Sequence, residues 1–330
     1  MQLADHFDVL LKDTVNLSQP KLDLLETRVD SIYEALKADD VIGSLISGKS
    51  PQGSWAQRTI INPVGKNEFD ADFMLDVKEN PDWSDSPKTY IDQVYAALHR
   101  HSIYKNMPLS RKCRCVSLVY ANSMHVDIVP HLNLADGREV IVNRDDNVWE
   151  KTNPRGFTAW MKEKDAIAKG NLRKIIRLMK YLRNHKNSFT GTRSILLTTL
   201  LGERVTELQV ISNPSYYSNV PTTLLHVIKD LDAWLQAQPN KPSIPDPSNP
   251  ETNFDHRWDQ FTYSYFRARI HAHAAEIEEA YEETDKDRSV RKWQDIFGGG
   301  FKAPTTSSSS PKFPAAASTA STVRRSGRAG

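Results

Sequence analysis

Acidic residues at short spacing are the first feature of this 330-residue sequence that could carry out chemistry. Asp70 and Asp72 stand two residues apart, and Asp127 is the one acid in the apolar segment 125–130. Carboxylates gathered at one point repel each other unless a cation binds between them, and carboxylates with substrate phosphates are the ligands that Mg²⁺ prefers. The three acids therefore indicate metal-assisted phosphate chemistry, if their segments adjoin. The alternative for Asp127 alone is a salt-bridged strand residue.

The bare Asp-x-Asp pattern has no value without its context. It occurs at Asp70/Asp72, Asp230/Asp232 and Asp285/Asp287. The second pair falls on a predicted helix, where residues i and i+2 point about 200° apart. The third pair falls in a predicted link between helices, where a solvated turn is the simpler interpretation. The first pair falls on a predicted strand, where residues i and i+2 share a face. Only that pair is expected to share an ion.

A glycine and a serine precede the acids. Gln52, Gly53 and Ser54 predict a tight turn that opens a short helix, where backbone N–H groups and a hydroxyl can meet a phosphate. Such a pair alone is usually just a turn. Its order is informative here, because Asp70 follows Gly53 after 70 − 53 = 17 residues.

The elements that must position these residues fall into two groups. Alternating apolar residues predict strands over 68–75 and 125–132, with a further strand over 113–120 that forms a hairpin with the latter across the turn 121–123. Helices are expected over 20–36 and 87–101. After Pro154 the pattern is helical, with helices expected over 171–186, 194–211, 221–238, 253–284 and 289–297.

In this order, the residues resemble the polymerase-beta-like nucleotidyltransferase superfamily. The sequence is most similar to the bacterial CD-NTases, relatives of cyclic GMP-AMP synthase and oligoadenylate synthase that act in CBASS antiphage systems. The resemblance covers about residues 15–301 and includes the helix segment 177–183, Arg193-Ser194, the loop 245–250 and the closing segment 292–298.

The resemblance implies a fold and a division of the chain. The fold class is α+β, with an N-terminal mixed sheet carrying helices and a C-terminal helical bundle. We expect a nucleotidyltransferase core over 1–155, whose N-terminal helix joins both lobes, a helical domain over 156–298 and a disordered tail over 299–330.

The resemblance also implies roles for single residues. Asp70, Asp72 and Asp127 would be catalytic and hold two Mg²⁺ ions, for which Mn²⁺ could substitute. The nucleotide-binding residues would be Gln52, Gly53, Ser54, Lys180 and Ser194, the last two at the β/γ end of the donor triphosphate. The residue after Ser194 is often aromatic in relatives and is Ile195 here, so the sequence does not predict the base that is used.

Charge and composition limit the partners. Residues 302–330 carry five basic and no acidic residues, so the body is mildly acidic, unlike a duplex-DNA binder. NTPs are the expected substrates, ATP first among them. The tail ends at Gly330, and the family analogy implies its conjugation to targets by an E1/E2-like, ubiquitin-transfer-type partner. No membrane span or signal peptide is predicted, and two cysteines are compatible with the bacterial cytoplasm.

The predicted function is the synthesis of a cyclic di- or trinucleotide second messenger with release of pyrophosphate. A linear oligoadenylate synthase and a protein-modifying nucleotidyltransferase remain alternatives within the superfamily. A catalytically idle nucleotide-sensing scaffold is the alternative from another class. The bases, ring size, linkage and activating signal are not predicted by the sequence.

Overall fold

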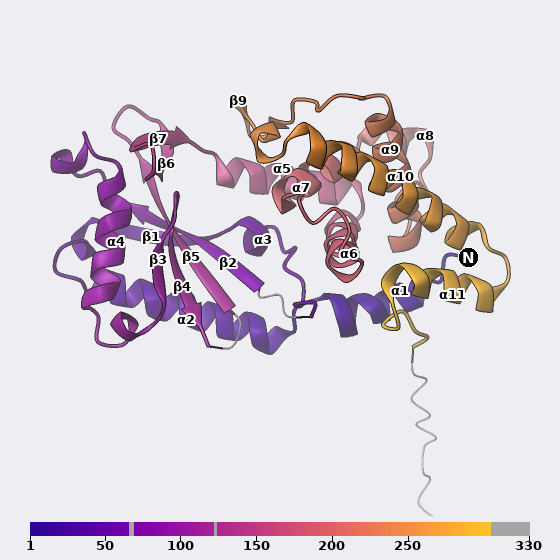
Figure 1. Ribbon diagram of the computed structural model, residues 1–330, viewed down its shortest axis with the longest axis horizontal. Helices are drawn as coiled ribbons and strands as arrows, with labels where there is room; N and C mark the ends of the chain where they lie inside the picture. The colour runs from indigo at the N-terminus through magenta and orange to yellow at the C-terminus, as the bar shows by residue number, and fades with distance from the viewer. Residues whose placement is uncertain (66–68, 122–123, 305–330) are drawn as a thin grey trace, which may run out of the picture.

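The protein consists of a sheet lobe and a helical lobe that lie side by side along its long axis (Figure 1). The computed structural model describes residues 1–65, 69–121 and 124–304, without the side chains of Phe69 and Asp70. The expected conjugation site, Gly330, lies outside the described residues, as does all of the chain beyond residue 304. None of the helices described over these ranges is long and apolar enough to cross a membrane.

The sheet lobe is built on a mixed sheet. Its strands run in the order β1-β2-β5-β4-β3, and β6 and β7 extend it beyond the end of β5. β2 and β5 are parallel, and the other neighbours are antiparallel. The strands are β1 (Ile46–Gln52), β2 (Phe69–Val77), β3 (Leu109–Arg111), β4 (Val116–Tyr120), β5 (Met124–Asn133), β6 (Glu139–Asn143) and β7 (Val148–Lys151).

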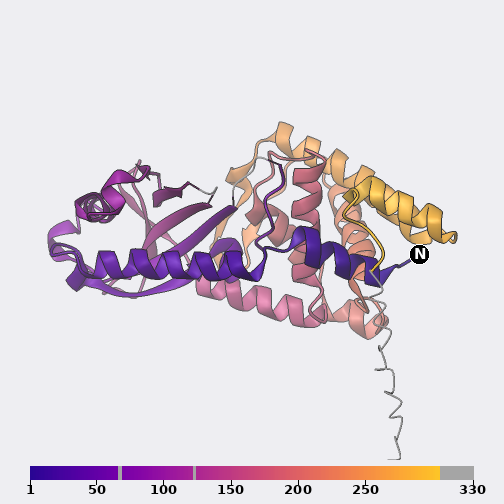
Figure 2. The same ribbon diagram turned by 90° about the horizontal axis from the view of Figure 1, so that it is seen from below.

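The alternation of side chains along these strands separates a core face from a polar face. Ala71, Phe73 and Leu75 on β2 join Val126 and Ile128 on β5 in one buried cluster. The helices α2 (Gln19–Lys37) and α4 (Lys88–Arg100) contribute their apolar stripes to the same cluster. Figure 2 shows α2 running along the sheet lobe. The opposite face, which carries Asp72 and Asp127, is left for the site.

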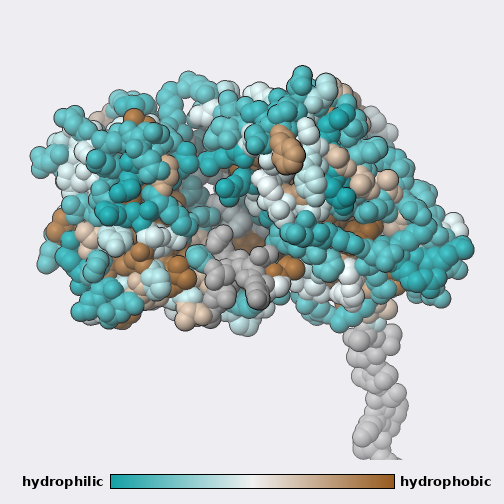
Figure 3. Space-filling model, viewed as in Figure 1, coloured by the Kyte–Doolittle hydropathy of each residue, from teal (hydrophilic) through white to brown (hydrophobic). Residues whose placement is uncertain are grey.

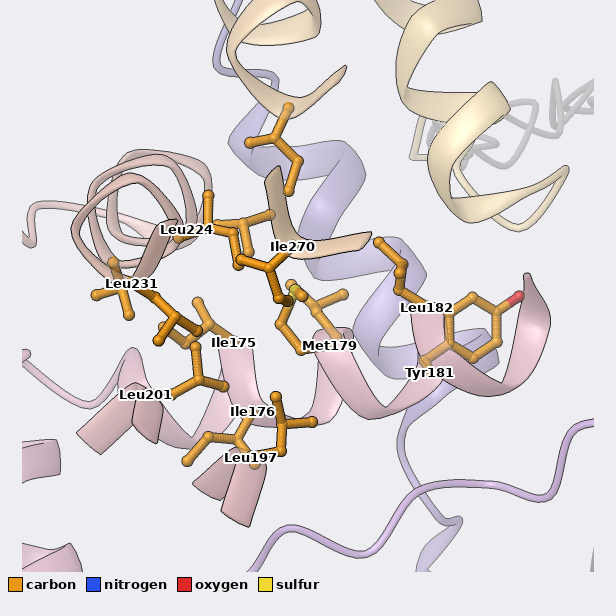
Figure 4. Packing of buried hydrophobic residues seen from close by; sticks show 14 of the residues in the cluster. Ile175, Ile176, Met179, Tyr181, Leu182, Leu197, Leu201, Leu224, Leu231 and Ile270 are labelled. Atoms are coloured by element: carbon orange, nitrogen blue, oxygen red, sulfur yellow. The ribbon is translucent and has the colours of Figure 1, made fainter. Parts of the chain in front are cut away.

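The helical lobe surrounds α6 (Leu172–His185), whose apolar face is buried on all its turns. Figure 4 shows Ile175, Ile176 and Met179 of α6 among leucines of α7 and α9. The other helices of this lobe are α1 (Ala4–Leu10), the π-helix η1 (Leu11–Val15), α5 (Pro154–Ile167), α7 (Ser194–Glu203), α8 (Glu207–Ser212), α9 (Val220–Gln236), α10 (Gln260–Glu282) and α11 (Lys286–Phe297).

Short elements complete the fold. The β8–β9 hairpin precedes α10, and α3 follows β1 directly; the 3₁₀ turns lie at chain reversals. These elements are α3 (Gly53–Ala56), β8 (Pro245–Asp246), β9 (Asn249–Asn253), η2 (Gly43–Leu45), η3 (Pro81–Trp83), η4 (Tyr104–Asn106) and η5 (Asp255–Arg257).

Four expected elements differ from the structure. The helix expected from residue 289 begins at Lys286, where Asp285 caps it. The helix expected over 194–211 is broken, because Thr206 forms a capping box with Gln209 and starts α8. The strand expected from Cys113 begins only at Val116, since the Lys112 N–H donates to the Cys115 carbonyl and closes a turn. The helix expected from residue 253 begins at Gln260, where Asp259 caps it.

The expected hairpin of the strands over 113–120 and 125–132 is present as the antiparallel pair β4–β5. The N-terminal segment contributes to both hydrophobic clusters. Phe7 and Val15 belong to the cluster of the helical lobe, and Leu17 belongs to the cluster of the sheet lobe. The N-terminal segment therefore packs on both lobes. The boundary predicted at residue 155 stays a prediction.

Candidate active site

A row of polar residues crosses the sheet at one level. Gln52 on β1 pairs with Asp72 on β2, Asp72 pairs with Asp127 on β5, and Asp127 pairs with Ser117 on β4. Residues directly opposite each other on neighbouring strands share a face. The register thus brings two of the predicted acids together and places Gln52 beside them. Asp70 lies on β2 opposite His125, and its side chain is outside the described part of the structure.

Gly53 lies against the Asp72 carboxylate. Its φ is +56°, and a Cβ atom on Gly53 would meet the Asp72 Oδ2 atom at 2.6 Å. Only glycine therefore allows the chain to turn from β1 into α3 at this distance from the acid. Ser54 follows as a half-buried residue of α3, and its carbonyl accepts the Thr59 N–H at 2.8 Å. The predicted short helix opened by Gly-Ser is present.

Asp127 has two neighbours that the sequence did not point to. The Lys112 ammonium group donates to both carboxylate oxygens of Asp127, at 3.2 and 3.1 Å. Burial, followed by the negative charge of Asp127, raises the pKa of the Cys115 thiol. Lys112 and Cys115 belong to the turn before β4, so this turn lies over the third acid.

The donor set fits a hard divalent cation. Carboxylate oxygens are the ligands that Mg²⁺ takes with substrate phosphates, and a cationic group, the Lys112 ammonium, already lies on Asp127. Among the described side chains, no three His, Cys, Asp or Glu residues gather as a ligand set. Asp72 and Asp127 are the two expected ligands whose side chains are described, and the third, Asp70, falls outside them.

A buried lysine from the helical lobe faces the sheet. Lys180 on α6 is 5% exposed, and its ammonium group donates to the Thr59 carbonyl and the Thr59 Oγ1, each at 3.1 Å. Burial lowers the pKa of Lys180 to about 7, and the positive charges of Arg183 and Arg177 act in the same direction. The Asp72 carboxylate opposes this shift, so Lys180 lies within its electrostatic reach.

Two arginines accompany Lys180 on α6. Arg177 donates to the Arg58 carbonyl at 2.7 Å, while its buried Nε has no hydrogen-bond partner among the described residues. Arg183 donates to the Thr192 carbonyl at 2.9 Å. In the described part of the chain, none of the three cations is within 4.0 Å of a carboxylate. Half-buried and buried cations without acidic partners indicate an anion site.

Ser194 lies at the start of α7, next to this group. The Arg183 side chain donates to the Ser194 Oγ at 3.3 Å. Ser194 is the first residue of α7, and the N-cap position before it is taken by Arg193, whose side chain makes no capping hydrogen bond. The structure therefore brings Lys180 and Ser194 together through Arg183, which the sequence analysis did not single out. The spacing of Arg177, Lys180 and Arg183 by three residues on one helix was the signal that could have found the arginines.

The surface is hollowed between the two lobes, with hydrophilic residues along both rims (Figure 3). Polar groups of the sheet lobe thus face cations of the helical lobe. Oxygen ligands for a cation on one side and basic groups on the other can hold a metal-bound polyphosphate. Ser117 lies opposite Asp127 within the β4–β5 hairpin, so the predicted turn at 121–123 was the signal that could have found it. Lys112 has no such signal, because it lies in the turn before β4.

Comparison with known proteins gives the family. Residues 1–165 match the model of the Second Messenger Oligonucleotide or Dinucleotide Synthetase domain, SMODS. A c-di-GMP synthase of Roseivirga ehrenbergii is 26% identical over 298 residues, which cover 78% of this chain and 76% of that protein. A cyclic AMP-AMP-AMP synthase of an Acinetobacter strain is 23% identical over 275 residues, which cover 82% and 78% respectively.

Solved structures agree on the fold. The E. coli CdnC structure with ATP superposes with a TM-score of 0.69 at 19% identity, covering 92% of this chain and all of that one. The CD-NTase CdnG of Bradyrhizobium diazoefficiens in complex with GTP has a TM-score of 0.69 at 17% identity, covering 89% and 95%. The expected α+β fold with a mixed sheet and C-terminal helices is confirmed. The family model covers half of the sequence, and the chain therefore belongs to the SMODS family of second messenger oligonucleotide or dinucleotide synthetases.

Proposed function

We propose that this protein is a divalent-metal-dependent nucleotidyltransferase that joins NTPs into a cyclic di- or trinucleotide and releases pyrophosphate. The relatives named c-di-GMP synthase and cyclic AMP-AMP-AMP synthase support a cyclic product. The observation that carries the proposal is the pairing of Asp72 with Asp127 across parallel strands. Facing them on α6 are Arg177, Lys180 and Arg183, which have no carboxylate within 4.0 Å among the described side chains. The resemblance to CD-NTases places such a product in CBASS antiphage signalling.

The two lobes bind different parts of the substrate in this reaction. Lys180, Arg183 and Ser194 bind the β/γ end of the donor triphosphate, and Gly53 and Ser54 meet it from the sheet lobe with Gln52 beside them. Two Mg²⁺ ions, when bound at Asp70, Asp72 and Asp127, supply positive charge that stabilises the departing pyrophosphate and acidifies the acceptor hydroxyl. Mn²⁺ is expected to substitute.

The atoms balance as a substitution at phosphorus. The acceptor ribose oxygen forms a bond to the α-phosphorus, the bond from that phosphorus to the bridging oxygen breaks, and pyrophosphate leaves with the electron pair. Asp127 is the carboxylate best placed to accept the hydroxyl proton, because it lies on the central strand of the site. A second transfer within the same site closes the ring.

The test is incubation of the protein with all four NTPs and Mg²⁺, followed by mass spectrometry. We expect a product that resists phosphatase and nuclease, whereas a linear product would be degraded and a protein-modifying enzyme would label protein. Asp70→Asn with Asp72→Asn should abolish turnover while the melting temperature stays near that of the wild type. Asp285→Asn with Asp287→Asn is the matched control, since Asn also caps α11. Normal pyrophosphate release by the first variant would show that the acids are assigned wrongly.

An idle scaffold is disfavoured by the same residues. Two facing carboxylates cost stability, and so does a buried lysine that pairs with none of the described carboxylates; a scaffold gains nothing from either. Conjugation of Gly330 by an E1/E2-like partner stays a prediction.

A further inference from the structure

We propose that Lys112 is a placeholder cation: its ammonium group occupies the cation position on Asp127 and must leave when a divalent ion binds there. This inference rests on the proposed function, which puts a metal ion on Asp127. The ammonium group lies 3.1 and 3.2 Å from the two carboxylate oxygens. These oxygens are the atoms that a hard cation would coordinate, so the two cations exclude each other.

The turn that carries Lys112 fixes its backbone, whereas its side chain lies at the surface. The Lys112 N–H donates to the Cys115 carbonyl at 2.8 Å, which closes the turn between β3 and β4. The Lys112 side chain is 49% exposed, whereas that of Asp127 is 16% exposed. A long side chain with its stem at the surface can withdraw its ammonium group into water at little cost.

The adjacent arginine, Arg111, contacts helix α4. Arg111 donates to Asp92 at 2.8 Å, and its guanidinium group lies over the Tyr95 ring at 4.8 Å. The turn therefore directs Lys112 to the acids and holds Arg111 on α4.

The acids need such a charge when no metal is bound. Asp72 and Asp127 are direct partners on parallel strands, and their carboxylates carry the same charge. A single positive charge on Asp127 reduces their repulsion, and a divalent ion reduces it further. Lys112 thus stabilises the metal-free site and competes with the metal, which makes it a determinant of metal affinity.

Metal binding without turnover tests this directly. The full chain is titrated with Mn²⁺ alone, and the free ion is followed by its electron paramagnetic resonance signal. We expect Lys112→Met to bind Mn²⁺ about two- to fivefold more tightly, the effect of removing one half-exposed competing ion pair. Lys112→Arg keeps a cation on Asp127 and should bind Mn²⁺ as weakly as the wild type.

Lys78→Met is the matched control, because Lys78 stands six residues beyond Asp72, about 20 Å along the strand direction. It should leave the affinity unchanged. Equal or weaker binding by Lys112→Met would overturn the inference; if that variant does not fold, Lys112→Gln provides the same comparison. Asp127→Asn distinguishes a failure of the proposed metal site from a failure of the Lys112 inference. If this variant bound Mn²⁺ as the wild type does, the metal site itself would be refuted, and with it the role of Lys112.

Discussion

At the scale of single residues, the site consists of groups that a stable fold would avoid. Asp72 faces Asp127 with like charge, and Lys180 is buried beside Thr59 with no carboxylate partner among the described side chains. Gln52 Oε1 and Ser117 Oγ, at the two ends of the same row, are buried without hydrogen-bond partners among the described residues. Unsatisfied polar atoms cost stability, and their concentration in one row indicates a place where ligands complete the structure.

Gly53 gives the sharpest prediction at this scale. Gly53→Ala places a methyl group 2.6 Å from the Asp72 Oδ2 and so must displace that carboxylate. We expect turnover to fall by at least about a hundredfold, because misplacing a reacting group by an ångström has effects of that order. The melting temperature should drop only slightly, since the left-handed backbone costs alanine about 1 kcal/mol.

Gly65→Ala is the control for that backbone cost. Gly65 has a φ of +64°, and a Cβ atom there would meet nothing within 4 Å. It should lose similar stability and keep its turnover, as measured by pyrophosphate release. Equal losses of turnover in both variants would mean that backbone strain, and not the contact with Asp72, is responsible.

At the scale of elements, the sequence predicted the strands of the site and the helix that faces them, but not the contacts of that helix with the sheet lobe. The alternation around Asp72 and the apolar run around Asp127 predicted β2 and β5, because a half-buried strand shows its two faces within a few residues. The partners of α6 could not be predicted, since they lie more than 115 residues away along the chain. The break at Thr206 was missed because apolar residues continue across it.

Side chains of helix α6 hydrogen-bond to consecutive backbone carbonyls of the segment that follows α3. Arg173, Arg177 and Lys180 donate to three consecutive carbonyls, those of Gln57, Arg58 and Thr59, at 2.9, 2.7 and 3.1 Å. The helix of one lobe thereby holds the chain that leads away from the Gly53-Ser54 turn of the other.

The two arginines of this row should respond differently to mutation. Arg173 also pairs with the buried Asp165 at 2.6 Å, so Arg173→Met leaves an unpaired carboxylate and should cost about 3 kcal/mol of stability. Arg177 has no carboxylate partner in the described part of the chain, so Arg177→Met should change the free energy of unfolding by less than about 1 kcal/mol. It should instead weaken NTP binding about tenfold. Thermal melting and a nucleotide titration measure both quantities, and an Arg177→Met variant with unchanged nucleotide affinity would contradict an anion site here.

At the scale of the whole molecule, each lobe supplies half of the proposed site. The sheet lobe contributes the carboxylates and Gly53, and the helical lobe contributes Lys180, Arg183 and Ser194. Each half is anchored in its own hydrophobic cluster, which sequence periodicity could predict. The distance between the halves depends on contacts between remote segments and could not be predicted.

Because Lys180 lies in the helical lobe of the site, nucleotide binding should be accompanied by proton uptake. Lys180 has its pKa lowered from 10.5 to about 7, so at pH 8 it is mostly neutral in the free protein. A bound triphosphate favours the ammonium form, and binding at pH 8 should therefore take up close to one proton. Calorimetry in buffers of different ionisation enthalpy measures this uptake, with a nonhydrolysable Mg-ATP analogue as the ligand.

The lowered pKa of Lys180 also affects how the free energy of unfolding depends on pH. Between about pH 7 and 10.5 the unfolded chain carries the Lys180 proton and the folded chain does not, so the contribution of Lys180 to stability rises with pH across this window.

Lys180→Met should abolish both the proton uptake and this rise, and it should weaken nucleotide binding. Arg204→Met removes a positive charge that lies over the Trp234 ring in the helical lobe and should retain both effects. Proton uptake that persists in Lys180→Met would place the linked proton on another group, and Lys180 would then be charged before the nucleotide arrives.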